Sequence, residues 1–203
     1  LLKLTGGVER PDPVALETYD DLLNRYGSVL FEKRKAFAEV YIPVFRKYYE
    51  FLVSGEETGL LYKSDLHDLS FGEGLRRNHG RDLALQRTTF GVHRDDYHFS
   101  LDGGDLKRLG SQGQQKSFVI ALKLAQFDVM RREKGFAPVL LLDDIFDKLD
   151  DLRIERLLQL IKNDELGQLF VTDARPDRTA ALLQQIDVPA LVYEVSGGKL
   201  KEA

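Results

Sequence analysis

The sequence predicts an α/β protein whose parallel strands alternate with helices, and whose N-terminal part is a helical arm. Two apolar runs within its 203 residues support this class. Val139–Leu142 is continuously apolar, as expected of a buried parallel strand, and Gln168–Thr172 is a second strand-like run after a helical pattern at 152–162. A strand–helix–strand unit of this spacing implies a right-handed parallel crossover.

Helical periodicity dominates the N-terminal arm. Asp12-Pro13 is a typical helix start, because proline fits the first helical turn, and we expect this helix to end at Gly27. A second helix is expected over 29–53, where apolar side chains recur at helical spacing, with a kink or break caused by Pro43. We expect the two helices to pack as a hairpin on the core, in preference to a free coiled-coil partner site.

Shorter elements are expected along the rest of the chain. In order, they are a strand near Leu60–Tyr62, a helix over 65–87, a strand Tyr97–Leu101, a helix over roughly 112–134, a short helix over 177–185 and a strand Leu191–Val195. We therefore divide the chain into a helical arm, residues 1–88, and an α/β portion, residues 89–203.

Composition excludes several classes of protein. An apolar fraction of 43% with 6 prolines indicates a packed globule rather than a disordered chain. The chain has no cysteine, so disulfides and thiolate metal sites are excluded, which fits a cytoplasmic location. No apolar run approaches the roughly 18 residues of a membrane span. The 4 histidines form no metal-ligand pattern, and no Ser-His-Asp arrangement is indicated.

The charge pattern argues against a strongly basic DNA-binding surface. The formal net charge is −4, so nucleic-acid binding would need a local basic patch or another part of a longer protein. Each basic cluster is expected to be a solvated helix face rather than a phosphate contact. The clusters are Lys33-Arg34-Lys35, Arg76-Arg77 with Arg81, and Arg131-Arg132 with Lys134.

The string Gly110-Ser111-Gln112-Gly113-Gln114-Gln115 predicts a serine-capped helix start with glycine in its first turn. Such a start has unpaired amides and a partial positive charge. Gly113 would let a phosphate approach the backbone, and the Ser111 hydroxyl could cap the helix or contact a phosphate oxygen. Taken alone, the string is also that of an ordinary capped helix.

Two carboxylates, Asp143 and Asp144, follow the apolar run Val139–Leu142. Side chains at the carboxyl end of a parallel strand lie where open α/β sheets bind ligands. Asp143 could bind Mg²⁺, and Asp144 could orient a water molecule for attack on a phosphoryl group. Taken alone, two solvated acids at a strand end are an equally good interpretation. No Gly-x-x-x-x-Gly-Lys-Ser/Thr loop occurs in the 203 residues.

Three runs together resemble the RecF family of bacterial DNA replication and repair ATPases, which are of the ABC/SMC-like class. They are Gly91–Asp96, Gly110–Lys116 and Leu140–Asp144. The resemblance extends from about Asp12 and is sharpest from Thr89 to Asp151. It implies the C-terminal part of an ABC-type P-loop ATPase, with the helical arm in lobe II. A missing N-terminal lobe would contain the Walker A phosphate loop. The start at Leu1 in place of Met suggests a fragment, a processed chain or a chain without its disordered first residues.

The resemblance implies a role for each candidate residue. Ser111, Gln112, Gly113 and Gln114 would form the signature motif, which contacts ATP bound to a partner subunit. Asp143 would be the Walker B residue that binds Mg²⁺, Asp144 would be catalytic, and Leu149-Asp150 would match the loop that crosses the dimer interface. For Gly91–Asp96 no mechanism is assigned.

The resemblance also implies cofactors and partners. ATP and Mg²⁺ would bind an ATP-dependent homodimer that acts at single-strand/double-strand junctions of gapped DNA. With RecO and RecR it would help to load RecA in recombinational repair. The intact dimer would hydrolyse ATP slowly, and this chain alone would be inactive.

The sequence departs from other cassette ATPases at two positions, and two other interpretations of the chain remain. Asp144 is shorter than the glutamate of many cassette ATPases, and Asp173 lies where such proteins usually have a histidine. One alternative is another ABC/SMC-type ATPase, for which longer uninterrupted heptads are expected. The other is a non-catalytic helical interaction module with decayed motifs.

Overall fold

The computed structural model describes residues 12–163, 166–175, 178, 181–182, 184 and 189–202. They form two compact units that are discontinuous in sequence. Unit 1 contains the described residues up to Pro43 and Glu57–Leu109; unit 2 contains Val44–Glu56 and the described residues from Gly110 onward. Helix α1 (Pro13–Leu52) contributes to both units. The predicted division into 1–88 and 89–203 concerns the lobes of a larger ATPase and stays a prediction.

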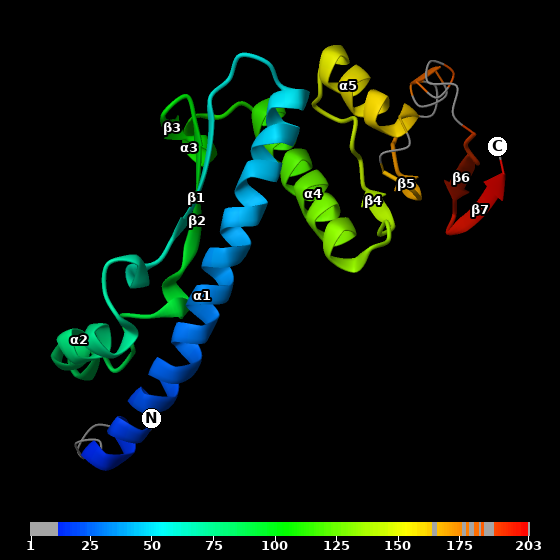
Figure 1. The fold of residues 1–203 in the computed structure, drawn as a ribbon. Coiled ribbons are helices and arrows are strands. Elements are labelled where there is room, and N and C mark those ends of the chain that lie inside the picture. The colour runs from blue at the N-terminus through cyan, green and yellow to red at the C-terminus, as the bar shows by residue number, and fades with distance from the viewer. Residues whose placement is uncertain are drawn as a thin grey trace. The chain divides into compact units, whose positions relative to one another are not determined.

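Helix α1 is one continuous helix of 40 residues (Figure 1). The prediction of two helices packed as a hairpin is therefore wrong, since the helix runs through both Gly27 and Pro43. Gly27 does not end the helix but makes room for a neighbour: a Cβ atom there would lie 2.1 Å from the Phe71 ring. Pro43 removes one amide donor from the helix, and packing on both sides of it outweighs that loss.

An antiparallel sheet forms the centre of unit 1, in the order β1-β2-β3. Strands β1 (Thr58–Lys63) and β2 (Asp96–Leu101) pair with Leu60 opposite Phe99, which confirms both strands predicted here. Asp102 and Gly103 have positive φ angles of 48° and 77° and turn the chain into β3 (Gly104–Asp105). The short helix α3 (Leu106–Leu109) follows.

The single helix predicted over 65–87 is two helices. A 3₁₀ turn, η1 (Asp65–His67), precedes α2 (Phe71–Leu85). The break lies at Ser70, whose extended backbone and side chain cap α2 by accepting a hydrogen bond from the Glu73 amide. A second 3₁₀ turn, η2 (Val92–Arg94), leads into β2.

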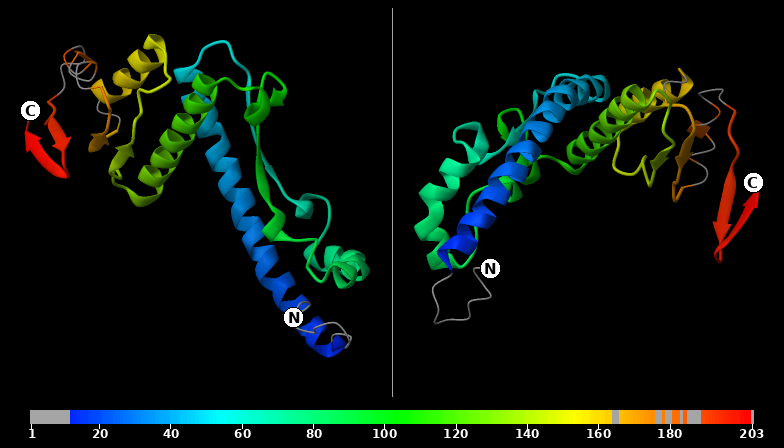
Figure 2. Two further views of the ribbon diagram at one scale, coloured as in Figure 1. Left: turned by 180° about the vertical axis from the view of Figure 1, so that it is seen from behind. Right: turned by 60° about the horizontal axis from the view of Figure 1, so that its bottom comes forward.

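The core of unit 1 joins α1 to the sheet and to α2. The ring centroids of Phe31 on α1 and Tyr62 on β1 are 6.4 Å apart, and those of Phe71 and Phe90 are 6.0 Å apart. Figure 2 shows β1 and β2 running beside the part of α1 that belongs to this unit. The buried cluster consists of Phe31, Ala38, Tyr62, Leu66, Phe71, Leu75 and Phe90.

Unit 2 contains the predicted strand–helix–strand arrangement. Helix α4 (Gln112–Lys134) has the predicted bounds and ends at Gly135, whose φ is 73°. Strand β4 (Leu140–Leu142), helix α5 (Asp151–Lys162) and strand β5 (Leu169–Val171) follow. Strands β4 and β5 pair in parallel, with Leu141 opposite Phe170, as the sequence predicts.

The core of unit 2 packs the last turns of α1 against α4. The centroids of the Phe45 and Phe118 rings lie 4.6 Å apart. Leu124 on α4 and Leu157 on α5 are fully buried in the same unit. One face of the β4–β5 pair is not covered: Leu141 is 70% exposed and Phe170 is 55% exposed. The expectation of a strand buried on both faces is thus not met within the described residues.

An exposed hairpin ends the described chain. Strands β6 (Tyr193–Ser196) and β7 (Lys199–Glu202) are antiparallel and joined by Gly197-Gly198, so the strand predicted at Leu191–Val195 begins two residues later (Figure 2). The short helix predicted over 177–185 falls largely outside the described residues. Among the helices of the described chain, none combines the length and apolarity that crossing a membrane requires.

Candidate functional site

The start of α4 is a reciprocal capping box. The Ser111 hydroxyl oxygen accepts a hydrogen bond from the Gln114 amide at 3.2 Å, and the Gln114 side-chain oxygen accepts one from the Ser111 amide at 2.8 Å. Serine with glutamine three residues later is the typical sequence of such a box. Ser111 and Gln112 are exposed, so this helix start faces solvent, and a helix N-terminus in that position favours an anion.

Gly113 lies against the loop that precedes α5. A Cβ atom at this position would lie 2.9 Å from Nη1 of Arg153 and 3.1 Å from the carbonyl oxygen of Lys148. Sequence reasoning explained this glycine by the approach of a phosphate. The structure adds a second reason, since the chain itself needs the space on this side of the helix.

Asp150 and Gln114, both predicted site residues, are joined through two side chains that sequence reasoning missed. Asp150 caps α5 by accepting a hydrogen bond from the Arg153 amide at 2.9 Å, and it lies 3.5 Å from the Arg153 guanidinium. Oε1 of Glu56 accepts a hydrogen bond from Nε2 of Gln114 at 3.1 Å and lies 3.4 Å from Nη2 of Arg153. Glu56 follows α1 in a polar stretch whose sequence contains no local pattern of a site.

Thr172, which follows β5, contacts the Asp143 carboxylate and the Asp144 backbone amide. The Thr172 hydroxyl donates to Oδ1 of Asp143 at 2.5 Å and accepts from the Asp144 amide at 2.9 Å. Both aspartates are exposed. Thr172 directly follows β5, and its position one residue after an apolar run is the pattern that could have identified it.

Lys116 connects the two halves of the predicted site. It lies one turn into α4, and its Nζ donates a hydrogen bond to the carbonyl oxygen of Asp144 at 2.9 Å. The structure therefore brings the start of α4, the loop after β4 and the N-terminal end of α5 together within unit 2.

Asp173 has a structural role in this chain. Its carboxylate is 2% exposed and receives two hydrogen bonds from Arg178, at 2.6 Å and 3.1 Å. Arg178 also donates to the carbonyl oxygen of Phe146 at 3.0 Å. The neighbouring Thr172 makes the contact with the two strand-end aspartates.

The run Gly91–Asp96 anchors β2 in unit 1. Asp95 Oδ2 accepts hydrogen bonds from Nη1 of Arg34 and from the Tyr62 hydroxyl, each at 2.6 Å. The hydrogen bond with Asp95 raises the pKa of Arg34, and burial, with the Asp95 contact second, raises the pKa of Tyr62 to about 12. Gly91 has a φ of 130°, which favours glycine.

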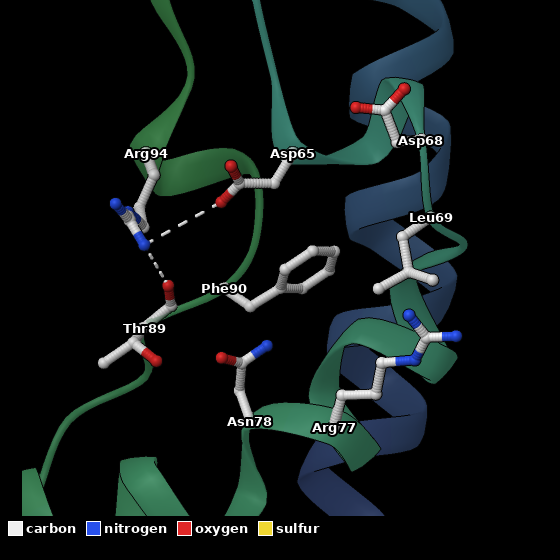
Figure 3. Close-up of a pocket in the computed structure, with 8 residues that line it drawn as sticks. All are labelled: Asp65, Asp68, Leu69, Arg77, Asn78, Thr89, Phe90 and Arg94. Atoms are coloured by element: carbon white, nitrogen blue, oxygen red, sulfur yellow. Dashed lines mark hydrogen bonds and ion pairs between the residues drawn. The ribbon is translucent and has the colours of Figure 1, made fainter.

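A pocket of about 390 Å³ lies beside this run, within unit 1. Figure 3 shows Arg94 between the Thr89 carbonyl, which accepts its hydrogen bond, and Asp65, 3.8 Å away. Two acidic and two basic side chains line the pocket, so it presents no single charge to a ligand. Its lining residues are Asp65, Asp68, Leu69, Arg77, Asn78, Thr89, Phe90 and Arg94.

Most of the basic clusters contain arginines that pair with acids of the chain. Arg131 and Arg132 both contact Asp128, which is 1% exposed, at 3.1 Å and 2.6 Å. Arg34 contacts Asp95, and Arg77 contacts Glu73. The clusters lie on α1, α2 and α4, and the expectation that they are solvated faces rather than phosphate contacts stays a prediction.

The described residues include no group of three or more histidine, cysteine or acidic side chains that could hold a metal ion. Asp143 nevertheless presents an exposed carboxylate in which one oxygen accepts the Thr172 hydrogen bond. A single carboxylate with further oxygens from a nucleotide is a usual environment for Mg²⁺.

The helices and the parallel strand pair have the fold of the C-terminal part of an ABC-type ATPase. Solved structures share this fold. One is described as the "recombination mediator protein RecF-ATP in RecFOR pathway"; it covers 100% of this chain and 53% of its own, at 23% identity and a TM-score of 0.74. Another, from work on SMC ATPases, covers 83% of this chain and 87% of its own, with 17% identity and a TM-score of 0.51.

Curated relatives identify the family, although no family model matches the chain. The DNA replication and repair protein RecF of Flavobacterium johnsoniae is 42% identical over 174 residues, 85% of this chain and 48% of its own length. RecF of Cytophaga hutchinsonii is 39% identical over 204 residues, 100% of this chain and 54% of its own. The chain belongs to the RecF family, as the sequence motifs indicated. It spans about half the length of the curated relatives it matches.

Proposed function

We propose that this chain supplies the signature motif and the Walker B acids of an ATPase that dimerises on ATP and binds DNA in replication and repair. The observation that supports this most directly is the exposed capping box of Ser111 and Gln114, joined by Lys116 to the loop of Asp143 and Asp144. A phosphate at such a helix start receives backbone hydrogen bonds and a favourable dipole.

The site is composite in this proposal. Ser111, Gln112, Gly113 and Gln114 contact the terminal phosphate of ATP on the partner subunit, and Asp150 lies at the dimer interface. Asp143 would hold Mg²⁺, which would supply positive charge at the phosphates. Asp144 orients the attacking water. The Walker A loop belongs to a part of the protein that is not in this sequence.

The exposed face of the β4–β5 pair supports the same proposal. Leu141 and Phe170 are neighbours across this pair, and both are largely exposed. A parallel sheet is ordinarily covered on both faces. We expect the remaining strands and helices of the ATPase core to cover these side chains.

The family is the basis for the partners that we propose. RecF relatives are named DNA replication and repair proteins, and the solved RecF structures are described within the RecFOR pathway. We propose that the dimer acts at gapped DNA and helps RecA loading with RecO and RecR. If the chain is instead a non-catalytic helical interaction module, substitutions in the proposed signature motif should not change dimerisation.

The test is the variant Ser111→Asp in the full-length protein. Aspartate caps a helix as well as serine does, so folding is retained, but its charge repels the partner's terminal phosphate. We expect loss of Mg-ATP-dependent dimerisation in sedimentation velocity. Ser70→Asp, at the serine cap of α2, is the matched control and should dimerise like the wild type. Unchanged dimerisation of Ser111→Asp would contradict the proposal.

A further inference from the structure

Glu56 occupies a central position in the polar contacts of unit 2. Its side chain is 18% exposed, and each of its carboxylate oxygens has a partner. Oε1 contacts Gln114 and Arg153, and Oε2 accepts a hydrogen bond from the Tyr49 hydroxyl at 2.6 Å. Tyr49 is fully buried on the last turns of α1, so it fixes the carboxylate from the protein interior.

Helix α5 holds the segment around Glu56 at two points. Arg153 contacts Glu56, and one turn later Nη2 of Arg156 donates to the Ser54 hydroxyl at 2.6 Å. The chain from Ser54 to Glu56 is thereby fixed against α5. The Glu56 carboxylate contacts a buried tyrosine, a glutamine amide and one arginine, so it has little freedom to move.

Two of the groups that Glu56 contacts belong to the two segments that we propose to lie at the dimer interface. Gln114 closes the capping box at the start of α4, and Arg153 contacts Asp150 in the loop before α5. The guanidinium of Arg153 also lies beside Gly113. Any shift of the Glu56 carboxylate therefore changes the position of the Gln114 side chain and of the Asp150 loop together.

We propose that Glu56 is a positioning residue for ATP-dependent dimerisation. It aligns the start of α4 with the Asp150 loop, so that both present the right geometry to a partner subunit. This inference rests on the proposed function, because it needs these two segments to lie at the dimer interface. Glu56 acts through Gln114 and Arg153 and does not itself contact the nucleotide.

The test compares Glu56→Ala with Glu56→Gln in the full-length protein. Glu56→Ala removes the acceptor of its contacts with Gln114, Arg153 and Tyr49. Because the two segments are then less well aligned, we expect the apparent dimer dissociation constant with Mg-ATP to rise about tenfold. Glu56→Gln keeps an acceptor oxygen for Gln114 and should lie between Glu56→Ala and the wild type. The neighbouring exposed residue gives the matched control, Glu57→Ala, which should dimerise normally.

A second measurement separates positioning from general damage to the fold. Nucleotide affinity is measured at protein concentrations too low for dimerisation, where the partner's segments play no part. We expect both Glu56 variants to keep the wild-type affinity there, with circular dichroism melting curves showing a folded protein. A parallel loss of monomer nucleotide affinity would overturn the inference, since it would indicate a structural role.

The inference and the proposed function fail in different ways. If Ser111→Asp abolishes dimerisation while Glu56→Ala dimerises like the wild type, only the role of Glu56 is wrong. If Ser111→Asp also dimerises like the wild type, the helix start does not contact the partner's nucleotide and both are wrong.

Discussion

Asp144 has a left-handed backbone conformation, with a φ of 46°. Aspartate and asparagine adopt this conformation more easily than longer residues, for which it costs about 1–2 kcal/mol. The backbone thus gives a physical reason for the short acid at a position where many cassette ATPases have glutamate. It also means that a longer carboxylate cannot be introduced here without strain.

The first prediction concerns the catalytic role proposed for Asp144. Asp144→Asn keeps the size and the left-handed backbone but cannot accept a proton from water. We expect ATP turnover of the full-length dimer to fall about 100-fold, within the usual range for loss of a general base. Asp151→Asn, in the exposed first turn of α5, is the control. Steady-state phosphate release measures both, and unchanged turnover in Asp144→Asn would exclude the role.

Tyr62 gives the second prediction. Burial and the contact with Asp95 raise its pKa from 10.0 to about 12. The unfolded chain therefore loses this proton near pH 10, while the folded chain keeps it until about pH 12. The contribution of the Tyr62 proton to the free energy of unfolding is therefore complete below pH 10. It is lost as the pH rises toward 12, and the free energy of unfolding falls by at most about 1.4 kcal/mol per pH unit.

Tyr62→Phe removes this titration, so the free energy of unfolding should fall less steeply with pH above 10. Tyr41, whose pKa burial also raises to about 12, remains and keeps part of the slope. Urea unfolding at several pH values measures the effect, with Tyr26→Phe at an exposed site as the control. An identical slope in Tyr62→Phe and the wild type would contradict the assignment.

At the scale of elements, two glycines inside helices predict opposite effects of the same substitution. Gly27→Ala places a methyl group 2.1 Å from the Phe71 ring, so we expect a loss of about 1–3 kcal/mol despite the gain in helix propensity. Gly80→Ala, in α2, meets nothing within 4 Å and should gain up to about 1 kcal/mol. Urea unfolding of both variants is the test, and stabilisation by Gly27→Ala would refute the close contact with Phe71.

The contact between Gly27 and Phe71 also explains why the helix end predicted at Gly27 was wrong. Glycine at residue 27 looked like a helix end because its local propensity is low, whereas the deciding interaction is with a residue 44 positions away in sequence. Residues 112–134 were predicted correctly because cap, apolar periodicity and the glycine after the last turn all agree locally. Strands β4 and β5 were likewise evident from apolar runs.

The candidate site also contains some residues that local sequence predicts and others that it does not. Ser111 caps α4, as predicted, and the two aspartates follow β4 as expected. Glu56, Arg153 and Thr172 were missed, because their roles depend on contacts between distant segments. No local pattern distinguishes such residues from ordinary polar ones.

At the scale of the whole molecule, this chain contains only one side of the proposed ATP site. The residues that we propose for the signature motif and the Walker B acids lie in unit 2, and no Gly-x-x-x-x-Gly-Lys-Ser/Thr loop occurs in the sequence. We therefore predict that the isolated chain does not bind Mg-ATP with micromolar affinity in isothermal titration. The full-length protein should bind in the same buffer, and tight binding by the isolated chain would show that a different phosphate site exists within it.

Glutamate and glutamine are ordinarily interchangeable as the third residue of a helix that begins with serine. Here they are not, because the amide of Gln114 gives its hydrogen to Glu56 at 3.1 Å. A glutamate would set two negative groups face to face at that distance. Glu56 precedes residue 114 by 58 positions in the chain, yet it determines that this residue is glutamine and not glutamate.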